Sequence, residues 1–288
     1  MKILVIGGTR YFGIPMVNTL LSKGHDVTIA TRGNVKVDFD GKVSYVTLDR
    51  TDSSSVKKAL FEQKFDVIID KIAYSSNDVK ALLENVSCDR YIQMSTCSVY
   101  PKEHADITED EFVTEEYPLK WADRLADYEE TKRNAERAVL EFMDSDACTF
   151  VRYPMVFGEN DYTGRLRFFV EHIYNDQPMN VDDLDMDIAF INEKEAGDFI
   201  AFLVDNPVSG AINGCSNGTV KVSEIISYIE GKLGKKAVID DKGDVSPLNG
   251  LLDTMSFSTG KARRAGYSFS DLDSWLYKLF DYEIGRLK

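Results

Sequence analysis

The chain opens on an apolar run that passes directly into a glycine-rich segment. Residues 2–6, the first predicted strand, read KILVI, and Gly7, Gly8 and Gly13 follow in the segment GGTRYFG. An uninterrupted apolar run is typical of a strand buried on both faces. Glycine lets the chain turn tightly, and a helix that begins after the turn directs its free N–H groups and positive dipole end at an anion. These residues predict a turn that binds the pyrophosphate of NAD or NADP, with an ordinary strand-to-helix turn as the alternative.

The first half of the chain alternates between candidate strands and candidate helices. Further strands are predicted at 26–31, 43–48, 65–70, 90–95 and 148–152, and helices at 15–22, 53–63, 77–85 and 125–143. The expected N-cap of the helix at 53–63 is Ser53, with Ser54 and Ser55 as alternatives, and that of the helix at 77–85 is Asn77. Connections of this length imply right-handed crossovers and a parallel sheet covered on both faces. The predicted fold class is therefore α/β, a doubly wound parallel Rossmann sheet.

This alternation loosens in the second half of the chain. Helices are predicted near 168–174, 196–204, 222–233 and 272–282. We expect a dinucleotide-binding Rossmann domain at 1–154 and a small interleaved C-terminal substrate lobe at 155–288. Elements near 186–206 are expected to return to the first domain.

Composition narrows the classes of partner. The net charge of −14 opposes binding to nucleic acid and to anionic membranes. The four cysteines and three histidines show no metal-ligand spacing, so no metal site is predicted. The first apolar run is too short for a signal peptide or a membrane span, so we expect a cytoplasmic protein with a small-molecule substrate.

Two arginines bear on the choice of cofactor. Arg10 lies inside the glycine turn, and Arg32 follows the second predicted strand, where an NAD-specific enzyme usually has an acidic residue. Guanidinium groups bind phosphate in forked geometry, so NADP is slightly favoured over NAD. The alternative is that Arg32 stacks on adenine or faces solvent. Asp49, after the third strand, is placed to accept a hydrogen bond from the adenine amino group, or else to stabilise a turn.

A tyrosine and a lysine lie on one face of the helix predicted at 125–143. Tyr128 and Lys132 form a Y-x-x-x-K motif. A phenol has a pKa of about 10, and a neighbouring cation favours its ionised form. Thr96 and Ser98 follow the fifth predicted strand, so their hydroxyls are expected in the crevice where cofactor and substrate meet. Glycine turn, hydroxyl and Tyr/Lys pair occur in the order that such a catalytic site requires.

These motifs resemble the extended short-chain dehydrogenases/reductases of the NAD-dependent epimerase/dehydratase group. The resemblance rests on the glycine turn, the segment STCSVY at 95–100, the Tyr/Lys pair and the segments 152–158 and 210–233. Within the group, GGTRYFG and the segments 70–74 and 160–165 are similar to the "GGTRF" branch. The resemblance implies that Tyr128 is the general acid/base, that Lys132 lowers its pKa and holds the cofactor ribose, and that Thr96 is the catalytic hydroxyl.

The predicted binding residues fall into two sets. The cofactor set, besides Tyr128 and Lys132, comprises Gly7, Thr9, Arg10, Tyr11, Phe12, Gly13, Arg32, Asp49, Arg50, Lys71, Ile72, Ala73, Tyr153 and Val156. The substrate set comprises Tyr74, Cys97, Ser98 and Arg165.

The sequence departs from the resembled group at positions that concern the substrate. Sugar dehydratases carry Asp-Glu after the catalytic threonine, where this chain has Cys97 and Ser98. The arginines with which epimerases clamp a diphosphate are missing near Met186 and Lys242. Dehydration and a diphosphate-linked substrate are therefore disfavoured. Arg165, with Arg167, could supply an anion site instead; the alternative is a solvated helix start.

The sequence as a whole predicts an NAD(P)-dependent oxidoreductase or epimerase. It would act on a hydroxyl/ketone carbon of a small polar, sugar-like substrate. One alternative is an NADPH-dependent reductase that releases its product. Another is a non-catalytic cofactor-sensing or RNA-binding protein, since some relatives in the resembled branch are associated with RNA. A homodimer through the helix with the Tyr/Lys pair is left open, because the exposed face of that helix is charged.

Overall fold

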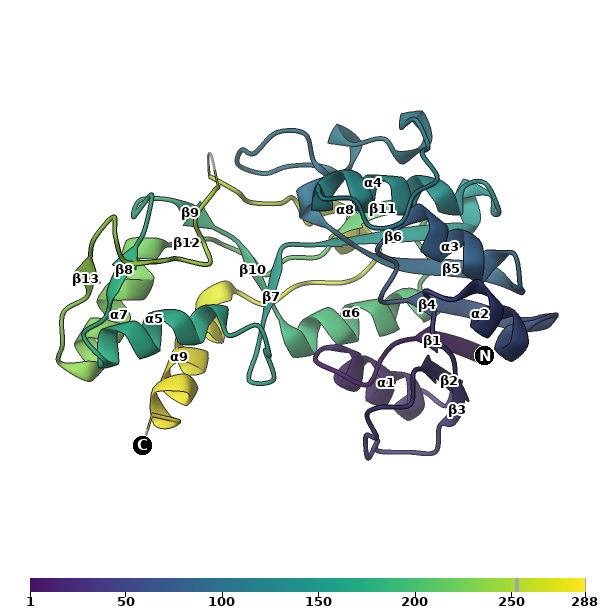
Figure 1. Cartoon of the computed structure of the whole chain (residues 1–288), viewed down its shortest axis with the longest axis horizontal. Coiled ribbons are helices and arrows are strands. Elements are labelled where there is room, and N and C mark those ends of the chain that lie inside the picture. Colours follow the sequence, from purple (N-terminus) through teal and green to yellow (C-terminus); the bar gives the residue numbers. More distant parts are fainter. Residues whose placement is uncertain (252–253, 288) are drawn as a thin grey trace.

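A seven-stranded parallel sheet forms the centre of the structure, a computed structural model that describes residues 1–251 and 254–287 (Figure 1). The strand order is β11-β6-β5-β4-β1-β2-β3. The strands are β1 (Lys2–Ile6), β2 (Asp26–Thr31), β3 (Ser44–Thr47), β4 (Gln63–Asp70), β5 (Val86–Thr96), β6 (Cys148–Tyr153) and β11 (Gly210–Asn213). Because all of these strands pair in parallel, their carboxyl ends meet at one edge. The predicted doubly wound sheet is confirmed.

Helices cover both faces of this sheet. Helices α1 (Gly13–Ser22) and α6 (Glu193–Asp205) pack against each other on one face. The other face carries α2 (Ser53–Leu60), α3 (Ser76–Leu83) and α4 (Tyr128–Val139) (Figure 1). Each face has its own hydrophobic cluster, so the strands are buried on both sides, as their continuous apolar runs predict.

Local hydrogen bonds set the starts of the helices. The cap of α2 is Asp52, whose carboxylate accepts from the Ser54 N–H at 2.9 Å, and not Ser53 as predicted. The cap of α3 is Ser75, not Asn77. Ser75 and Asp78 form a reciprocal capping box, which satisfies two backbone N–H groups at once.

The C-terminal part forms a lobe with a separate core. Its helices are α5 (Arg165–Tyr174), α7 (Val222–Leu233) and α9 (Leu276–Gly285). Short strands complete it: β7 (Met155–Phe157) pairs with β10 (Phe190–Asn192), β9 (Asp187–Ile188) with β12 (Val220–Lys221), and β8 (Pro178–Asn180) with both β13 (Val238–Ile239) and β14 (Asp244–Val245). The single helix predicted at 272–282 is interrupted at Trp275, which has φ −130° and donates from its indole to the Ser216 hydroxyl.

Several late elements return to the sheet. Helix α6 packs along α1, β11 pairs with β6, and α8 (Gly260–Arg264) lies beside β11. The returning part thus extends beyond the expected range 186–206. Five 3₁₀ turns complete the described elements: Cys97–Val99, Glu109–Glu111, Thr114–Glu116, Ser145–Ala147 and Leu272–Ser274. None of the helices in these ranges combines the length and apolarity needed to cross a membrane.

Candidate active site at the carboxyl edge of the sheet

The glycine turn closes on itself between β1 and α1. Gly7 and Gly8 have φ angles of +96° and +95°, a conformation that favours glycine. A Cβ on Gly13 would lie 2.7 Å from the Cα of Gly8, so no larger residue fits at this position without opening the turn. Helix α1 begins at Gly13, after a cap residue, Phe12, that makes no side-chain hydrogen bond to the helix start. The Gly13 and Ile14 N–H groups donate to the carbonyls of Arg10 and Tyr11, at 3.1 and 2.9 Å, so the helix start offers an anion its positive dipole end.

Two aromatic residues of this turn pack inward. Tyr11 is 9% exposed and donates its hydroxyl to the carbonyl of Val156 on β7. Phe12 is buried, with its ring centroid 6.1 Å from that of Tyr153. Both side chains join the turn to the sheet and the lobe, so their contribution to a cofactor site is through the backbone. Thr9 and Arg10 remain at the surface of the turn, and Arg10 is exposed.

The residues after β2 and β3 divide into exposed and buried groups. Arg32 is exposed. The Asp49 carboxylate accepts from the Thr51 N–H and hydroxyl at 3.0 and 2.7 Å. These bonds, and more weakly the Arg32 charge, lower the pKa of Asp49. Asp49 thus stabilises a turn, which is the second of the two roles considered for it. Its negative charge partly offsets the positive charge of Arg32.

Arg50 requires a correction. It was expected to contact the cofactor, but its guanidinium is buried and donates to both carboxylate oxygens of Asp70, at 2.5 and 2.7 Å, and to the Asp78 carbonyl at 2.7 Å. Asp70 also accepts from the Tyr91 hydroxyl at 2.7 Å. Arg50 thus neutralises a carboxylate that strand β4 carries into the interior. Sequence spacing gave no indication of a pair 20 residues apart.

The segment after β4 lies beside the glycine turn. The Lys71 N–H donates to the Ile6 carbonyl at 3.2 Å, and the side chains of Lys71 and Ile72 lie within 4 Å of a Cβ built on Gly7. The carbonyl of Ala73 accepts from the ammonium of Lys132 at 2.9 Å. The predicted cofactor residues 71–73 therefore border the turn, next to the Tyr/Lys pair.

The Tyr/Lys pair lies at the start of α4. Asp127 caps this helix through the N–H groups of Glu129 and Glu130, so Tyr128 is its first residue. Lys132, one turn further, is fully buried and donates to the carbonyls of Ala73 and Met94, both at 2.9 Å. Lys132 thus fastens the segment after β4 to the end of β5. An ammonium has three N–H donors, and these two bonds use two of them.

The pKa of Tyr128 is shaped by groups on three elements. Surrounding protein displaces much of the water from Tyr128, although the residue is 48% exposed, and this desolvation raises its pKa to about 12. Tyr74 adds to the rise, while the nearby Thr96 hydroxyl and the charges of Arg165 and Arg124 oppose it. The cations that act most on Tyr128 are thus arginines, not Lys132 as expected. Burial lowers the pKa of Lys132 itself to about 8, against the effect of Glu136.

Thr96 and Ser98 supply two hydroxyl groups to the site. Thr96 ends β5, and its hydroxyl donates to that of Ser98 and accepts from the Ser98 N–H, both at 3.2 Å. The expectation that Cys97 faces the substrate disagrees with the structure. Its side chain is 2% exposed in a small apolar cluster, and burial raises its pKa.

Arginines approach Tyr128 from two sides. Arg165 is the first residue of α5 in the C-terminal lobe, and its charge lowers the pKa of Tyr128. Arg124, in the loop before α4, lies 3.8 Å from the ring centroid of Tyr74. By contrast, Arg167 is paired with Glu283 at 3.0 Å. Arg124 was missed in the sequence because it belongs to no motif; its position just before the Tyr/Lys helix was the available signal.

Tyr153 also requires a correction. It was expected beside the nicotinamide, but its hydroxyl donates to the carbonyl of Ala196 at 2.6 Å, and the residue is 3% exposed. Its ring packs against Phe12 and Phe199. Val156 is partly buried against the same cluster and offers its carbonyl to Tyr11. Tyr153 and Val156 therefore stabilise the glycine turn through their contacts with Phe12 and Tyr11.

A buried ion pair anchors α4 to the sheet. Arg152 on β6 donates to Glu136 on α4 at 2.8 and 3.2 Å, and neither side chain has exposed surface. The Thr114 hydroxyl donates to the same carboxylate at 2.7 Å. Pairing with Arg152 and these hydrogen bonds lower the pKa of Glu136 despite its burial. The helix with Tyr128 is thus held in one position on the sheet.

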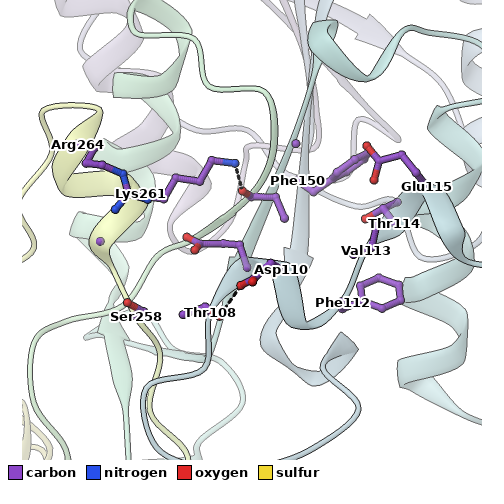
Figure 2. A pocket seen from close by; sticks show the side chains of 14 residues that line it. Thr108, Asp110, Phe112, Val113, Thr114, Glu115, Phe150, Ser258, Lys261 and Arg264 are labelled. Atoms are coloured by element: carbon purple, nitrogen blue, oxygen red, sulfur yellow. Dashed lines mark hydrogen bonds between the residues drawn. The ribbon is translucent and has the colours of Figure 1, made fainter.

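A separate hollow of about 520 Å³ lies at the open edge of the sheet (Figure 2). The Lys261 ammonium there donates to the carbonyls of Ser209 and Ala211, at 2.8 and 2.6 Å, and Glu109 accepts from the Asn213 N–H at 3.0 Å. Side chains thus satisfy backbone groups of edge strand β11. None of the predicted site residues lines this hollow, and its Lys261 and Glu109 protect the edge of the sheet.

The fold and the carboxyl-edge geometry define a dinucleotide-binding Rossmann protein of the extended short-chain type. The model of the NAD dependent epimerase/dehydratase family matches residues 3–84 and 72–215. The chain belongs to this family.

Known proteins similar to this chain fall into two groups. It is 33% identical over 115 residues to the chloroplast stem-loop binding protein of 41 kDa b of Arabidopsis thaliana, a match that covers 35% of this chain and 30% of that protein. Its fold is similar to UDP-glucose 4-epimerase of Thermotoga maritima with UDP-glucose (TM-score 0.75, 16% identity, all of both chains). It is also similar to UDP-glucuronic acid 4-epimerase of Bacillus cereus with UDP-glucuronic acid and NAD (TM-score 0.74, 19% identity, all of both chains).

Proposed function

We propose that this protein is an NAD(P)-dependent oxidoreductase or epimerase that acts on a hydroxyl/ketone carbon of a small polar, sugar-like substrate. The observation that carries this proposal is the meeting of Tyr128 and Thr96 at the carboxyl edge. Thr96 is close enough to Tyr128 to lower its pKa, and Lys132 holds the two adjoining segments. In open α/β sheets this edge is where ligands bind.

The chain has a place for the dinucleotide. The glycine turn leaves no room for a Cβ at Gly13, and the first N–H groups of α1 are not capped by a side chain. A pyrophosphate fits such a turn because backbone groups can approach it closely. We propose NADP over NAD on the exposed Arg10 and Arg32, and Asp49 weakens that preference.

Tyr128 supplies the proton transfer. When bound, the nicotinamide exchanges a hydride with the substrate carbon. Tyr128 is neutral at pH 7, so it donates a proton to the substrate oxygen when a ketone is reduced and takes that proton back when an alcohol is oxidised. The positive charges of Arg124 and Arg165 favour the second direction because they stabilise the phenolate. Thr96 holds the substrate oxygen by a hydrogen bond.

The substrate in this proposal carries an anionic group. Among the described parts of the chain, no carboxylate forms an ion pair with Arg124 or Arg165, whereas Arg167 is paired. A carboxylate or phosphate on the substrate would meet these guanidinium groups next to Tyr128.

The test is the variant Tyr128→Phe, with Tyr45→Phe on β3 as a control. A panel of anionic hydroxy acids and sugars is screened by NAD(P)H fluorescence. Loss of the proton donor lowers turnover about 10²- to 10⁴-fold while dinucleotide binding remains. Undiminished turnover in Tyr128→Phe contradicts the proposal. Stoichiometric oxidation of NADPH indicates the reductase, and turnover without net consumption the epimerase.

A second candidate function follows from the plant relative. That protein is named for stem-loop binding, and the match to it includes 35% of this chain. The net charge of −14 opposes such binding here. A filter-binding titration with a stem-loop RNA decides: tight affinity that falls steeply with salt favours this function, and its absence favours the enzyme.

A further inference from the structure

Lys71 is a partly buried cation beside the glycine turn. It follows β4 directly, and its ammonium lies 3.9 Å from the ring centroid of Phe12. In the ranges 1–251 and 254–287, the Lys71 side chain forms no hydrogen bond or ion pair. Burial alone lowers its pKa to about 8. Lys71 therefore lies among apolar groups with no counter-charge from the protein.

An ammonium in this position costs free energy that the fold does not recover. Contact with an aromatic face compensates only part of the lost hydration. The charged groups on neighbouring elements are otherwise engaged. Asp70 is held by Arg50 and Tyr91, and Lys132 donates to two backbone carbonyls. An anionic ligand would supply the missing counter-charge.

The position of Lys71 indicates which anionic ligand would supply this counter-charge. Phe12, whose ring it contacts, is the cap of α1, and the first turn of α1 contains no acidic residue. The positive dipole end of α1 and the Lys71 ammonium thus lie at the turn and come from two different elements. We propose that Lys71 donates a charge-assisted hydrogen bond to the pyrophosphate of the dinucleotide cofactor. This inference rests on the proposed function and adds a cationic contact to a turn that otherwise offers backbone groups.

The role is distinct from recognition of a 2′-phosphate. Arg10 and Arg32 are the exposed cations proposed for that group, whereas Lys71 lies beside Gly7 at the centre of the sheet. Lys71 should therefore contribute equally to binding of NAD, NADP and ADP-ribose. It should contribute nothing to binding of adenosine, which has no phosphate.

Calorimetric titration with ADP-ribose and with adenosine tests this proposal. In Lys71→Met, the affinity for ADP-ribose should fall about 10- to 100-fold, as for loss of a hydrogen bond between charged groups, while that for adenosine is unchanged. Lys71→Arg should retain most of the affinity. Lys2→Met is a matched control, because the Lys2 ammonium lies 4.4 Å from the Phe65 ring at the opposite edge of the same sheet. It should bind both ligands normally.

The pH dependence supplies a second readout. Bound pyrophosphate raises the pKa of Lys71 above about 8, so the affinity of the unaltered chain is constant below pH 8 and falls above it. In Lys71→Met this fall disappears. Normal binding of ADP-ribose by Lys71→Met, with the same pH profile, overturns the role of Lys71 alone. If the unaltered chain binds neither dinucleotide nor ADP-ribose, the proposed function is overturned with it.

Discussion

Replacement of Lys132 by methionine tests the buried ammonium beneath Tyr128. Burial lowers the pKa of Lys132 from 10.5 to about 8. The unfolded chain therefore binds more protons than the folded chain between these values, so stability rises with pH across this interval. At about 1.4 kcal/mol per pH unit, the rise from this one group is about 3 kcal/mol. Below pH 8 the folded state carries the full cost of burying the charge.

The two consequences of Lys132→Met oppose each other at pH 7. The variant loses hydrogen bonds to Ala73 and Met94, worth about 1–3 kcal/mol each, but also loses the buried charge. Urea unfolding followed by circular dichroism, from pH 7.5 to 10.5, separates the two effects. The unaltered chain should gain about 3 kcal/mol relative to the variant over this range. Exposed Lys42→Met should show no such trend, and a pH-independent difference for Lys132→Met would refute the reasoning.

Three further substitutions test the glycine turn, the buried ion pair of Glu136 and the proposed anion contact of Arg165. Gly13→Ala places a Cβ against the opposite side of the turn, so we expect lost dinucleotide binding and a lower melting temperature; Gly231→Ala, with no atom within 4 Å, should lose neither. Glu136→Gln leaves a buried guanidinium without its charge partner, and denaturant titration should show a loss of about 3–5 kcal/mol. Arg165→Gln should raise KM for an anionic substrate about 10-fold, and Arg167→Gln should not; equal effects would exclude the anion role.

The regular part of the fold is predictable from sequence because local pattern and burial agree there. Strands β1 and β2 have the predicted bounds, since their apolar runs end at polar or glycine residues. The N-cap residues of α2 and α3 were predicted less accurately. Several neighbouring polar residues can cap each helix, and hydrogen-bond geometry decides that Asp52 and Ser75 do so. The lobe has strands of two or three residues, too short for any periodicity.

The candidate site was predictable where sequence spacing alone fixes proximity. Tyr128 and Lys132 share a helix turn, so their relation follows from local structure, and Thr96 ends a strand, so its place at the carboxyl edge follows from the parallel sheet. Contacts between distant segments could not be predicted. Arg50 turns inward to Asp70, and Tyr11 reaches a carbonyl 145 residues away. Both depend on packing that the sequence pattern does not encode.

The most direct test of the central claim is calorimetric titration of the purified chain with NAD and NADP. The structure places one glycine turn, with the start of α1, at the carboxyl edge of the sheet. We predict one dinucleotide bound per chain, with NADP the tighter ligand. No binding of either dinucleotide at millimolar concentration would contradict the proposed cofactor and the chemistry assigned to Tyr128.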